Sequence, residues 1–290
     1  MRQGDESYRE QMLYSDLHPE GKDRPLLVQF CGNGPAALAK ACQAAAAHGG
    51  MDGFDLNLGC PQQVAADGRF GAFLLDVEHW PLVEALVRAM STATDLPVAC
   101  KIRLLPELEH TLSFAKMLER AGCRLLAVHG RLRGDPAQRL RRKGPADLGA
   151  IAAVKAAATI PVLSNGNVRE QSDLLRNLGT TAADGLMVGE ALLADPTLFA
   201  PPRAAASQTA RVEGFAAEYL ELAAAHPPTQ GFRVVQQHVH HFMGRHGRST
   251  TLRYRRAPHR EPKQLRDEIA ASSSTEELLG IVRRALRTET

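Results

Sequence analysis

The chain contains 290 residues, of which 44% are hydrophobic and 23% are charged, and it carries a formal net charge of +3 at pH 7. This length suits one large domain followed by a small one. No stretch reaches the roughly 18 to 20 continuous apolar residues of a membrane span, and the opening MRQGDESYREQ lacks the basic head and apolar core of an export signal. We therefore expect a cytoplasmic chain, with a nuclear or organellar location left open.

From Pro25 to about Phe199, short apolar runs alternate with amphipathic stretches, a pattern typical of parallel strands joined by crossover helices. The first helix is expected over 35–47, because it begins with a proline and stops at two glycines. Each strand is expected to be a continuous apolar run, because helices cover one face of the sheet. The expected strands are 26–30, 54–58, 97–102, 124–128, 161–164 and 184–188.

Polar and glycine residues stand at or directly after the ends of these runs. A β/α barrel places its chemistry there, because the loops that leave the carboxyl ends of its strands converge on one mouth. A doubly wound open sheet also binds ligands at this edge, but six successive strands that end in this way favour the (β/α)8 barrel. The residues are Gln29, Asn57, Gly59, Cys60, Lys101, Arg103, His129, Gly130, Arg131, Asn165, Gly166, Asn167, Gly189 and Glu190.

After Pro201 and Pro202 the apolar residues recur at helical spacing, in 212–225, 232–243, 262–271 and 275–286. We expect a catalytic barrel in 1–200 and a small all-helical domain in 201–290. Four histidines lie between 238 and 246, but no cysteine or carboxylate accompanies them at ligand spacing, so we predict no metal site.

Positive charge gathers in two stretches despite the small net charge. Residues 131–143 hold five arginines and one lysine against one acid, and residues 245–260 hold six arginines and no acid. Either stretch alone fits a solvated surface, but together they favour a nucleic-acid partner. Tyr254 is available there for stacking on a base.

The cysteines are odd in number and show neither a C-x-x-C motif nor Cys/His metal spacing, which indicates reduced thiols. Cys60 differs from the rest because a strand leads directly into its Gly-Cys-Pro turn, which places the thiol at the mouth of the barrel. We predict that Cys60 can donate a proton to a substrate carbon and that Asn57 orients a planar, amide-bearing ring. The other cysteines are Cys31, Cys42, Cys100 and Cys123.

The motifs PLLVQF, DLNLGCPQ, GAFLL, CKIR, AVHGR, SNGNV and GLMVGEALLADPTLF follow one another along the chain. DxNxGCP with K-x-R and H-G-R downstream is a specific combination, and in it the chain resembles the dihydrouridine synthases over 8–199, and more weakly through the helical tail. DLNLGCPQ, GAFL and KIR followed by Pro106 and Glu107 are most similar to the eukaryotic type that modifies uridines 16 and 17 in the D-loop of tRNA.

The resemblance implies that FMN, reduced by NADPH or NADH, passes hydride to C6 of a uracil in tRNA while Cys60 protonates C5. Lys101 would lie beside the N1/C2 edge of the flavin. The implied cofactor-binding residues are Gln29, Lys101, His129, Asn165, Gly166, Asn167, Gly189 and Glu190. The expected substrate-binding residues are Asn57, Arg103, Arg131, Arg133, Arg253, Arg255 and Arg256. The expected partner is tRNA, bound by a monomer.

The chain departs from the family pattern in two respects. The family's barrel has eight strands, the first with an Ala-Pro-Met turn over the flavin, so we expect the chain to lack the first one or two strands. Glu190 stands where many members have an arginine on the FMN phosphate, so the Gly189 N–H is the contact expected to remain. Two alternatives stay open: a flavin-dependent reductase of a free pyrimidine, and an inactive RNA-binding remnant without its first strand.

Overall fold

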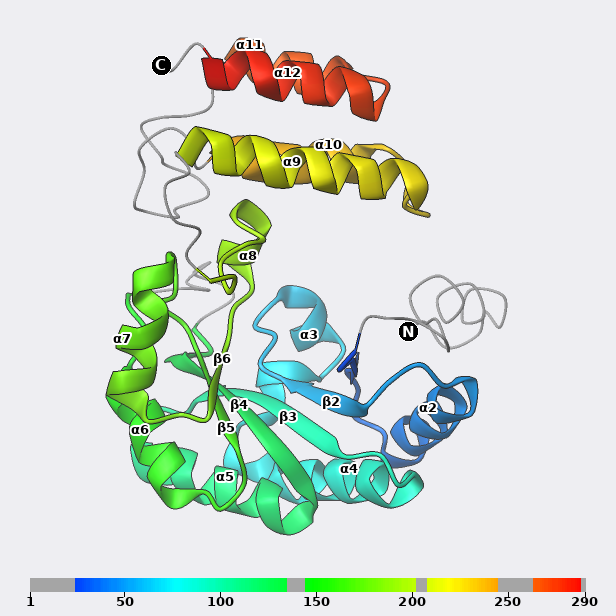
Figure 1. Cartoon of the computed structure of the whole chain (residues 1–290). Coiled ribbons are helices and arrows are strands. Elements are labelled where there is room, and N and C mark those ends of the chain that lie inside the picture. Colours follow the sequence, from blue (N-terminus) through cyan, green and yellow to red (C-terminus); the bar gives the residue numbers. More distant parts are fainter. Residues whose placement is uncertain (1–23, 135–143, 202–207, 245–262, 288–290) are drawn as a thin grey trace. The chain divides into compact units, whose positions relative to one another are not determined.

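The computed structural model describes residues 24–134, 144–201, 208–244 and 263–287 (Figure 1). These residues form two compact units. The first takes in the chain up to Val168 together with Ser172–Met187, and the second takes in Arg169–Gln171 and everything from Val188 onward. The second unit therefore begins before residue 200, where the change of sequence pattern indicated a boundary.

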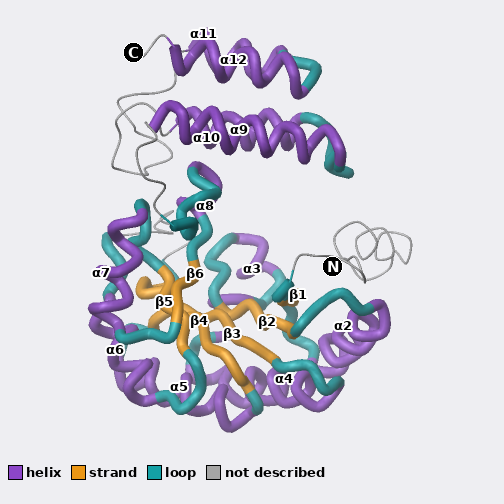
Figure 2. Tube along the Cα trace, in the orientation of Figure 1, coloured by secondary structure: helices purple, strands orange, loops and turns teal. Residues whose placement is uncertain are grey.

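The first unit is built on a sheet of six parallel strands that lie in the order of the sequence. The sheet curls into part of a barrel (Figure 2). Each strand falls where the sequence predicts one, so the β/α-barrel type of fold is confirmed for this unit. The strands are β1 (Leu27–Phe30), β2 (Gly53–Leu58), β3 (Val98–Leu104), β4 (Cys123–Leu132), β5 (Val162–Asn165) and β6 (Gly185–Met187).

Helices connect the strands and cover the outer face of the sheet, as Figure 1 shows for α2, α4, α5 and α6. This arrangement follows from parallel pairing, because each connection must cross from one end of the sheet to the other. The helices are α2 (Pro35–His48), α3 (Gln63–Asp67), α4 (Trp80–Ala93), α5 (Leu108–Ala121), α6 (Leu148–Ala157) and α7 (Gln171–Thr181), with the 3-10 turns η1 (Gly71–Leu74) and η2 (Val77–His79).

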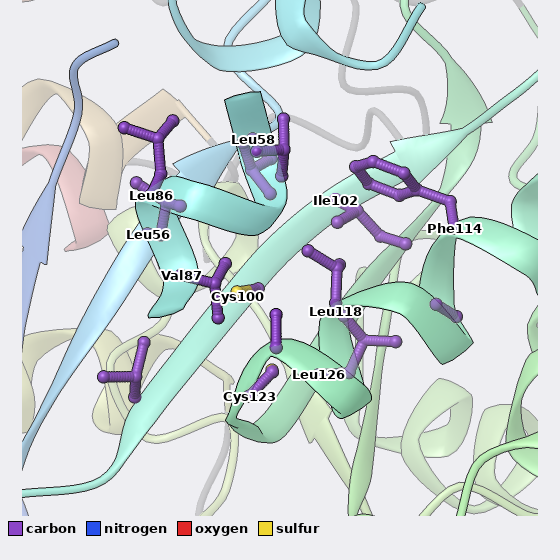
Figure 3. Close-up of a cluster of buried hydrophobic side chains, with 14 of the residues drawn as sticks. Leu56, Leu58, Leu86, Val87, Cys100, Ile102, Phe114, Leu118, Cys123 and Leu126 are labelled. Atoms are coloured by element: carbon purple, nitrogen blue, oxygen red, sulfur yellow. The ribbon is translucent and has the colours of Figure 1, made fainter. Parts of the chain in front are cut away.

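The main core lies between the outer face of the sheet and these helices. Leu56, Ile102 and Leu126 point outward from successive strands and pack with Leu86 of α4 and Phe114 of α5 (Figure 3). Because side chains alternate along a strand, the residues between them point to the opposite, inner face. That inner face carries the polar residues.

The sheet is also tied at its amino-terminal edge. The carboxylate of Asp52, just before β2, accepts a hydrogen bond of 2.6 Å from the backbone N–H of Leu26. Asp184, just before β6, accepts one of 2.7 Å from the N–H of Val162. These side chains pair neighbouring strands at the end opposite to the predicted mouth.

The second unit is helical, as the sequence predicts, and has its own core. Phe215 and Phe242 meet edge to face with their ring centroids 5.2 Å apart, and Val239, Leu278 and Ile281 are buried around them. Its helices are α8 (Glu190–Ala194), α9 (Gln208–Ala225), α10 (Arg233–Gly244), α11 (Lys263–Ala271) and α12 (Thr275–Arg287). None of the helices in the described ranges is both long and apolar enough to cross a membrane.

β4 is the one strand that clearly exceeds its predicted length, since it continues past Val128 to Leu132. His129, Gly130 and Arg131 have the composition of a turn, yet a shift in register lets Leu132 pair with Leu104 of β3. Strand length here is set by the partner strand, which sequence composition does not show.

Candidate active site

The register of the sheet brings the predicted polar residues together on its inner face, near the carboxyl ends of the strands. Gln29 pairs with Asp55, and Asn57 pairs with Lys101. Arg103 pairs with His129, which pairs in turn with Asn165. Residues that are far apart in the sequence therefore lie side by side in three short polar runs across the sheet.

Lys101 lies on β3, beside Asn57 of β2. Its Nζ donates to Oδ1 of Asn165 over 3.1 Å, and Nδ2 of Asn165 donates to the carbonyl oxygen of Met187 over 2.7 Å. Burial and, to a smaller extent, the neighbouring Arg103 lower the pKa of Lys101 to about 8, whereas Asp55 opposes the change. The side chain is therefore a cation below about pH 8 and loses its charge as the pH rises through that value.

Asp55 is part of the site although sequence reasoning did not include it. Asp55 is 5% exposed, and its carboxyl group accepts a hydrogen bond of 2.5 Å from Nε2 of Gln29. Burial raises its pKa, while the Gln29 amide and Lys101 act in the opposite direction. The signal was present in the sequence, because Asp55 is a carboxylate within a buried strand, on the same face as Asn57.

Cys60 lies at the end of β2 in a turn that is held from several sides. Oδ1 of Asn57 accepts hydrogen bonds of 3.0 Å from the N–H groups of both Gly59 and Cys60. Nε of Arg103 donates to the carbonyl oxygen of Gly59 over 2.7 Å, and the N–H of Ala72 donates to that of Cys60 over 3.1 Å. The thiol is half-buried and free.

The turn packs directly against Gly71, the first residue of η1. Gly71 has a φ of +65°, which favours glycine. A Cβ at this position would lie 2.9 Å from the carbonyl oxygen of Cys60 and 3.0 Å from its Cβ. The GAFL motif therefore supplies both a hydrogen bond and a close-packed wall for Cys60.

Arg103 and Arg133, both expected to bind substrate, make contacts within the protein. Arg103 is 5% exposed, and besides Gly59 it donates to the carbonyl oxygen of Leu132 over 3.0 Å. Arg133 donates to Asp76 over 2.8 Å and to the carbonyl oxygen of Ala72 over 3.2 Å, and its guanidinium carbon lies 5.0 Å from the centroid of the Phe73 ring. These contacts tie the ends of β3 and β4 to the Cys60 turn and to η1.

A second cluster surrounds the ends of β4 and β5. Nη1 of Arg131 lies 2.9 Å from Nε2 of His129, and Nη2 donates to Oδ1 of Asn167 over 3.2 Å. Asn167 also pairs with both backbone groups of Ala146, at 2.7 and 2.8 Å. Gly166 has a φ of +124° and packs closely against Ala146, since a Cβ at position 166 would be 2.6 Å from the Cβ of Ala146.

The other predicted site residues are not among the described residues of the first unit. Gly189 and Glu190 stand at the start of α8 and belong to the second unit. Arg253, Arg255 and Arg256 lie outside the described residues.

Two further features bear on ligand binding. Among the residues that the structure describes, no group of three or more His, Cys, Asp or Glu side chains is arranged to hold a metal ion. A pocket of about 490 Å³ opens beside the ends of β3 and β4, and Arg131 is the predicted site residue in its lining.

The comparisons with known proteins agree on one family. The model of the dihydrouridine synthase family matches residues 1–289. The tRNA-dihydrouridine(16/17) synthase-like protein of Rattus norvegicus is 41% identical over 223 residues, which are 77% of this chain and 48% of that protein. The tRNA-dihydrouridine(16/17) synthase of Schizosaccharomyces pombe is 36% identical over 75% of this chain and 53% of its own length. The chain thus spans about half the length of these relatives.

A bacterial relative and a solved structure complete the comparison. The tRNA-dihydrouridine synthase B of Pseudomonas putida is 33% identical over 76% of this chain and 66% of that protein. Among solved structures, the aldolase QR15 matches 58% of this chain and 70% of its own length at 13% identity and a TM-score of 0.44. The family match and the sequence identities lead to one conclusion: the chain belongs to the dihydrouridine synthase family.

Proposed function

We propose that this chain reduces uridine to 5,6-dihydrouridine in the D-loop of tRNA, at positions 16 and 17, with FMN as cofactor, NADPH or NADH as reductant and Cys60 as the acid. The observation that carries the proposal is the free thiol of Cys60, held at the carboxyl end of β2, beside the neighbouring strand β3 that carries the partly buried Lys101. A proton donor and a cation beside one sheet edge suit the reduction of a carbonyl-bearing ring.

The groups on the inner face fit FMN. Lys101 offers an ammonium to an electron-rich ring edge, and Gln29 offers an amide. His129, Arg131 and the Asn165–Gly166–Asn167 segment bring basic and amide groups and a close backbone approach together, which suits a phosphate. Gly189 and Glu190 remain sequence-based assignments to the same cofactor. When bound, FMN supplies the hydride that uracil requires at C6.

The residues of the chain supply the remaining chemistry. Cys60 gives its proton to C5 of the uracil as hydride arrives at C6, so that the C5–C6 double bond becomes a single bond and the thiolate is later reprotonated from water. Asn57 holds the backbone of the Cys60 turn through Oδ1 and keeps an amide hydrogen for a ring carbonyl. Arg103 fixes the same turn from its other side.

Binding of tRNA is assigned to the arginine-rich stretches. A uracil in folded tRNA must leave its stack to reach Cys60, and basic side chains would hold the neighbouring phosphates. Replacing Arg253, Arg255 and Arg256 with glutamine should therefore weaken tRNA binding and reduce the slope of log Kd against log salt concentration by up to about 2 to 3. An unchanged slope would assign tRNA binding to other residues.

The central experiment uses the purified 290-residue chain, FMN, NADPH and a tRNA transcript that contains no dihydrouridine. We expect a yellow protein whose FMN is reduced once by NADPH alone but which keeps oxidising NADPH when the tRNA is present. The tRNA should gain about 2 Da in mass for each uridine reduced. Equal turnover of free uridine would support the free-pyrimidine reductase instead. Salt-dependent tRNA binding without any flavin spectrum would support the inactive remnant.

A further inference from the structure

Asp55 is a buried acid on the inner face of the sheet that the proposed chemistry does not use. The residue is 5% exposed, and its carboxyl group accepts a hydrogen bond from the side chain of Gln29, an exposed residue 26 positions earlier in the sequence. Burying a carboxylate costs free energy unless hydrogen bonds or a nearby opposite charge compensate for the lost water. The hydrogen bonds of Gln29 show which groups Asp55 is connected to.

Four hydrogen bonds join side-chain and backbone groups into a single network. Nε2 of Gln29 donates to Asp55 over 2.5 Å, and Oε1 of Gln29 accepts from Nδ2 of Asn57 over 3.1 Å. Oδ1 of Asn57 then accepts from the N–H groups of Gly59 and Cys60, each over 3.0 Å. The network of hydrogen bonds begins at the carboxylate of Asp55 and ends at the backbone of Cys60.

The Asp55 carboxylate and the backbone N–H groups of Gly59 and Cys60 determine the direction of the hydrogen bonds between them. A carboxylate accepts only, so Gln29 must turn its nitrogen toward Asp55 and its oxygen toward Asn57. Backbone N–H groups donate only, so Asn57 must turn its oxygen toward Cys60 and its nitrogen toward Gln29. A reversed amide at either position would place two donors or two acceptors face to face.

We propose that Asp55 is a positioning residue, which acts through Gln29 to orient the Asn57 amide and so holds the Cys60 turn in place. This inference rests on the proposed function for its consequence in tRNA reduction, but the orientation itself concerns groups of this chain alone. Nε2 of Gln29 and Nδ2 of Asn57 each donate one hydrogen within this network and have a second hydrogen available for a ligand. The site therefore presents N–H donors to a ligand, which suits the carbonyl-rich edges of both a flavin and a uracil.

Two substitutions and their combination test the direction of the bonds. Gln29→Glu sets two carboxylates against each other, and they repel at about pH 8. Asp55→Asn gives an amide that can present either atom, so it no longer fixes the direction. In the double variant, the new amide nitrogen at position 55 can donate to the new carboxylate at position 29. That carboxylate still accepts from Asn57, so the original direction at Asn57 returns.

The first readout needs neither cofactor nor tRNA. Iodoacetamide modifies free thiols, and the rate at Cys60 can be compared with that at the exposed Cys31 by peptide mass spectrometry. We expect Gln29→Glu to raise the Cys60-to-Cys31 ratio about fivefold or more, as loss of one hydrogen bond would. The double variant should return to within about twofold of the wild-type ratio, a non-additivity expected of directly coupled residues.

The second readout is the Kd for FMN, measured by quenching of flavin fluorescence, with dihydrouridine formation as the third. FMN affinity and dihydrouridine formation should both be lowest in Gln29→Glu and higher in the double variant. Asp52→Asn is the matched control, because Asp52 bonds Leu26 at the opposite end of the same two strands. It should lower stability and leave the cysteine ratio unchanged.

The outcomes separate the two proposals. Independent, additive effects of Gln29→Glu and Asp55→Asn on the cysteine ratio would overturn the role of Asp55. So would an equal change in Asp52→Asn. A wild-type chain that neither binds FMN nor forms dihydrouridine would contradict the proposed function, while the cysteine ratio in the same protein would still decide the role of Asp55.

Discussion

At the scale of single residues, the site combines a thiol, a cation and a buried carboxylate on adjacent strands. The environment of each depends on contacts with residues from several elements. Cys60 is held by Asn57, Arg103 and Ala72, and Lys101 contacts Asn165. These contacts allow separate tests of the acid and of the cation.

Replacing Cys60 with alanine tests the acid. We expect FMN binding and the reduction of FMN by NADPH to stay unchanged, while dihydrouridine formation falls about 10²- to 10⁴-fold, the usual contribution of a general acid. Nucleoside mass spectrometry measures the product. Cys31→Ala is the control, since Cys31 is exposed and free and should affect neither step. Full activity in Cys60→Ala would remove this residue from the mechanism.

Lys101 predicts how FMN binding depends on pH. Its pKa is lowered to about 8, so the ammonium is present below that pH and is lost as the pH rises through it. An anionic ligand should bind more weakly above about pH 8, by up to about tenfold for each pH unit, the limit for one coupled proton. Fluorescence titration from about pH 7 to about pH 9.5 measures this dependence. Lys101→Met should bind FMN weakly at every pH in this range, with no change around pH 8. If FMN binding by this variant still changed with a midpoint near pH 8, the pH dependence would belong to another group.

At the scale of elements, η1 supports the Cys60 turn and is itself held by Arg133. The fold class and the six strands were predictable, because continuous apolar runs alternate with amphipathic ones. The role of η1 was not, since GAFL is too short for periodicity. Its contacts with Cys60 depend on a positive φ at Gly71, which a sequence does not display.

Gly71→Ala tests the contribution of this element. The change combines a φ of +65° with a Cβ placed 2.9 Å from the Cys60 carbonyl oxygen, so we expect a loss of about 1 to 3 kcal/mol in the free energy of unfolding. Dihydrouridine formation should fall as well, because the Cys60 turn must shift. Gly179→Ala in α7 is the control, since its Cβ would meet nothing within 4 Å, and it should be neutral or stabilising. Urea unfolding compares the two, and equal stabilities would show that η1 adapts without cost.

At the scale of the whole molecule, the chain has two hydrophobic cores in two compact units. The sequence predicted a barrel-type unit and a helical one, and both exist. The division falls at Val188, because α8 belongs with the later helices. Apolar periodicity alone cannot assign a five-residue helix to one unit or the other.

Separate cores predict separable losses of stability. Ile281→Ala removes a buried side chain from the second core and should cost about 2 to 5 kcal/mol in the free energy of unfolding, while the Cys60-to-Cys31 alkylation ratio, a property of the first unit, should remain at the wild-type value. Leu222→Ala is the matched control, because Leu222 of α9 is 55% exposed and its loss should cost little. Urea unfolding and peptide mass spectrometry after iodoacetamide treatment together measure the two effects. A parallel change of the Cys60-to-Cys31 ratio in Ile281→Ala would show that the first unit depends on the second.

The sequence by itself determined the family, the parallel strands and the residues at their carboxyl ends, because composition and short motifs are local properties of the chain. Tertiary structure decided which of those residues meet. The bond between Asp55 and Gln29 joins residues 26 apart, and Arg133 reaches Asp76 across 57 positions. Such pairs depend on strand register and on the curl of the sheet, and both arise from packing among all the strands at once.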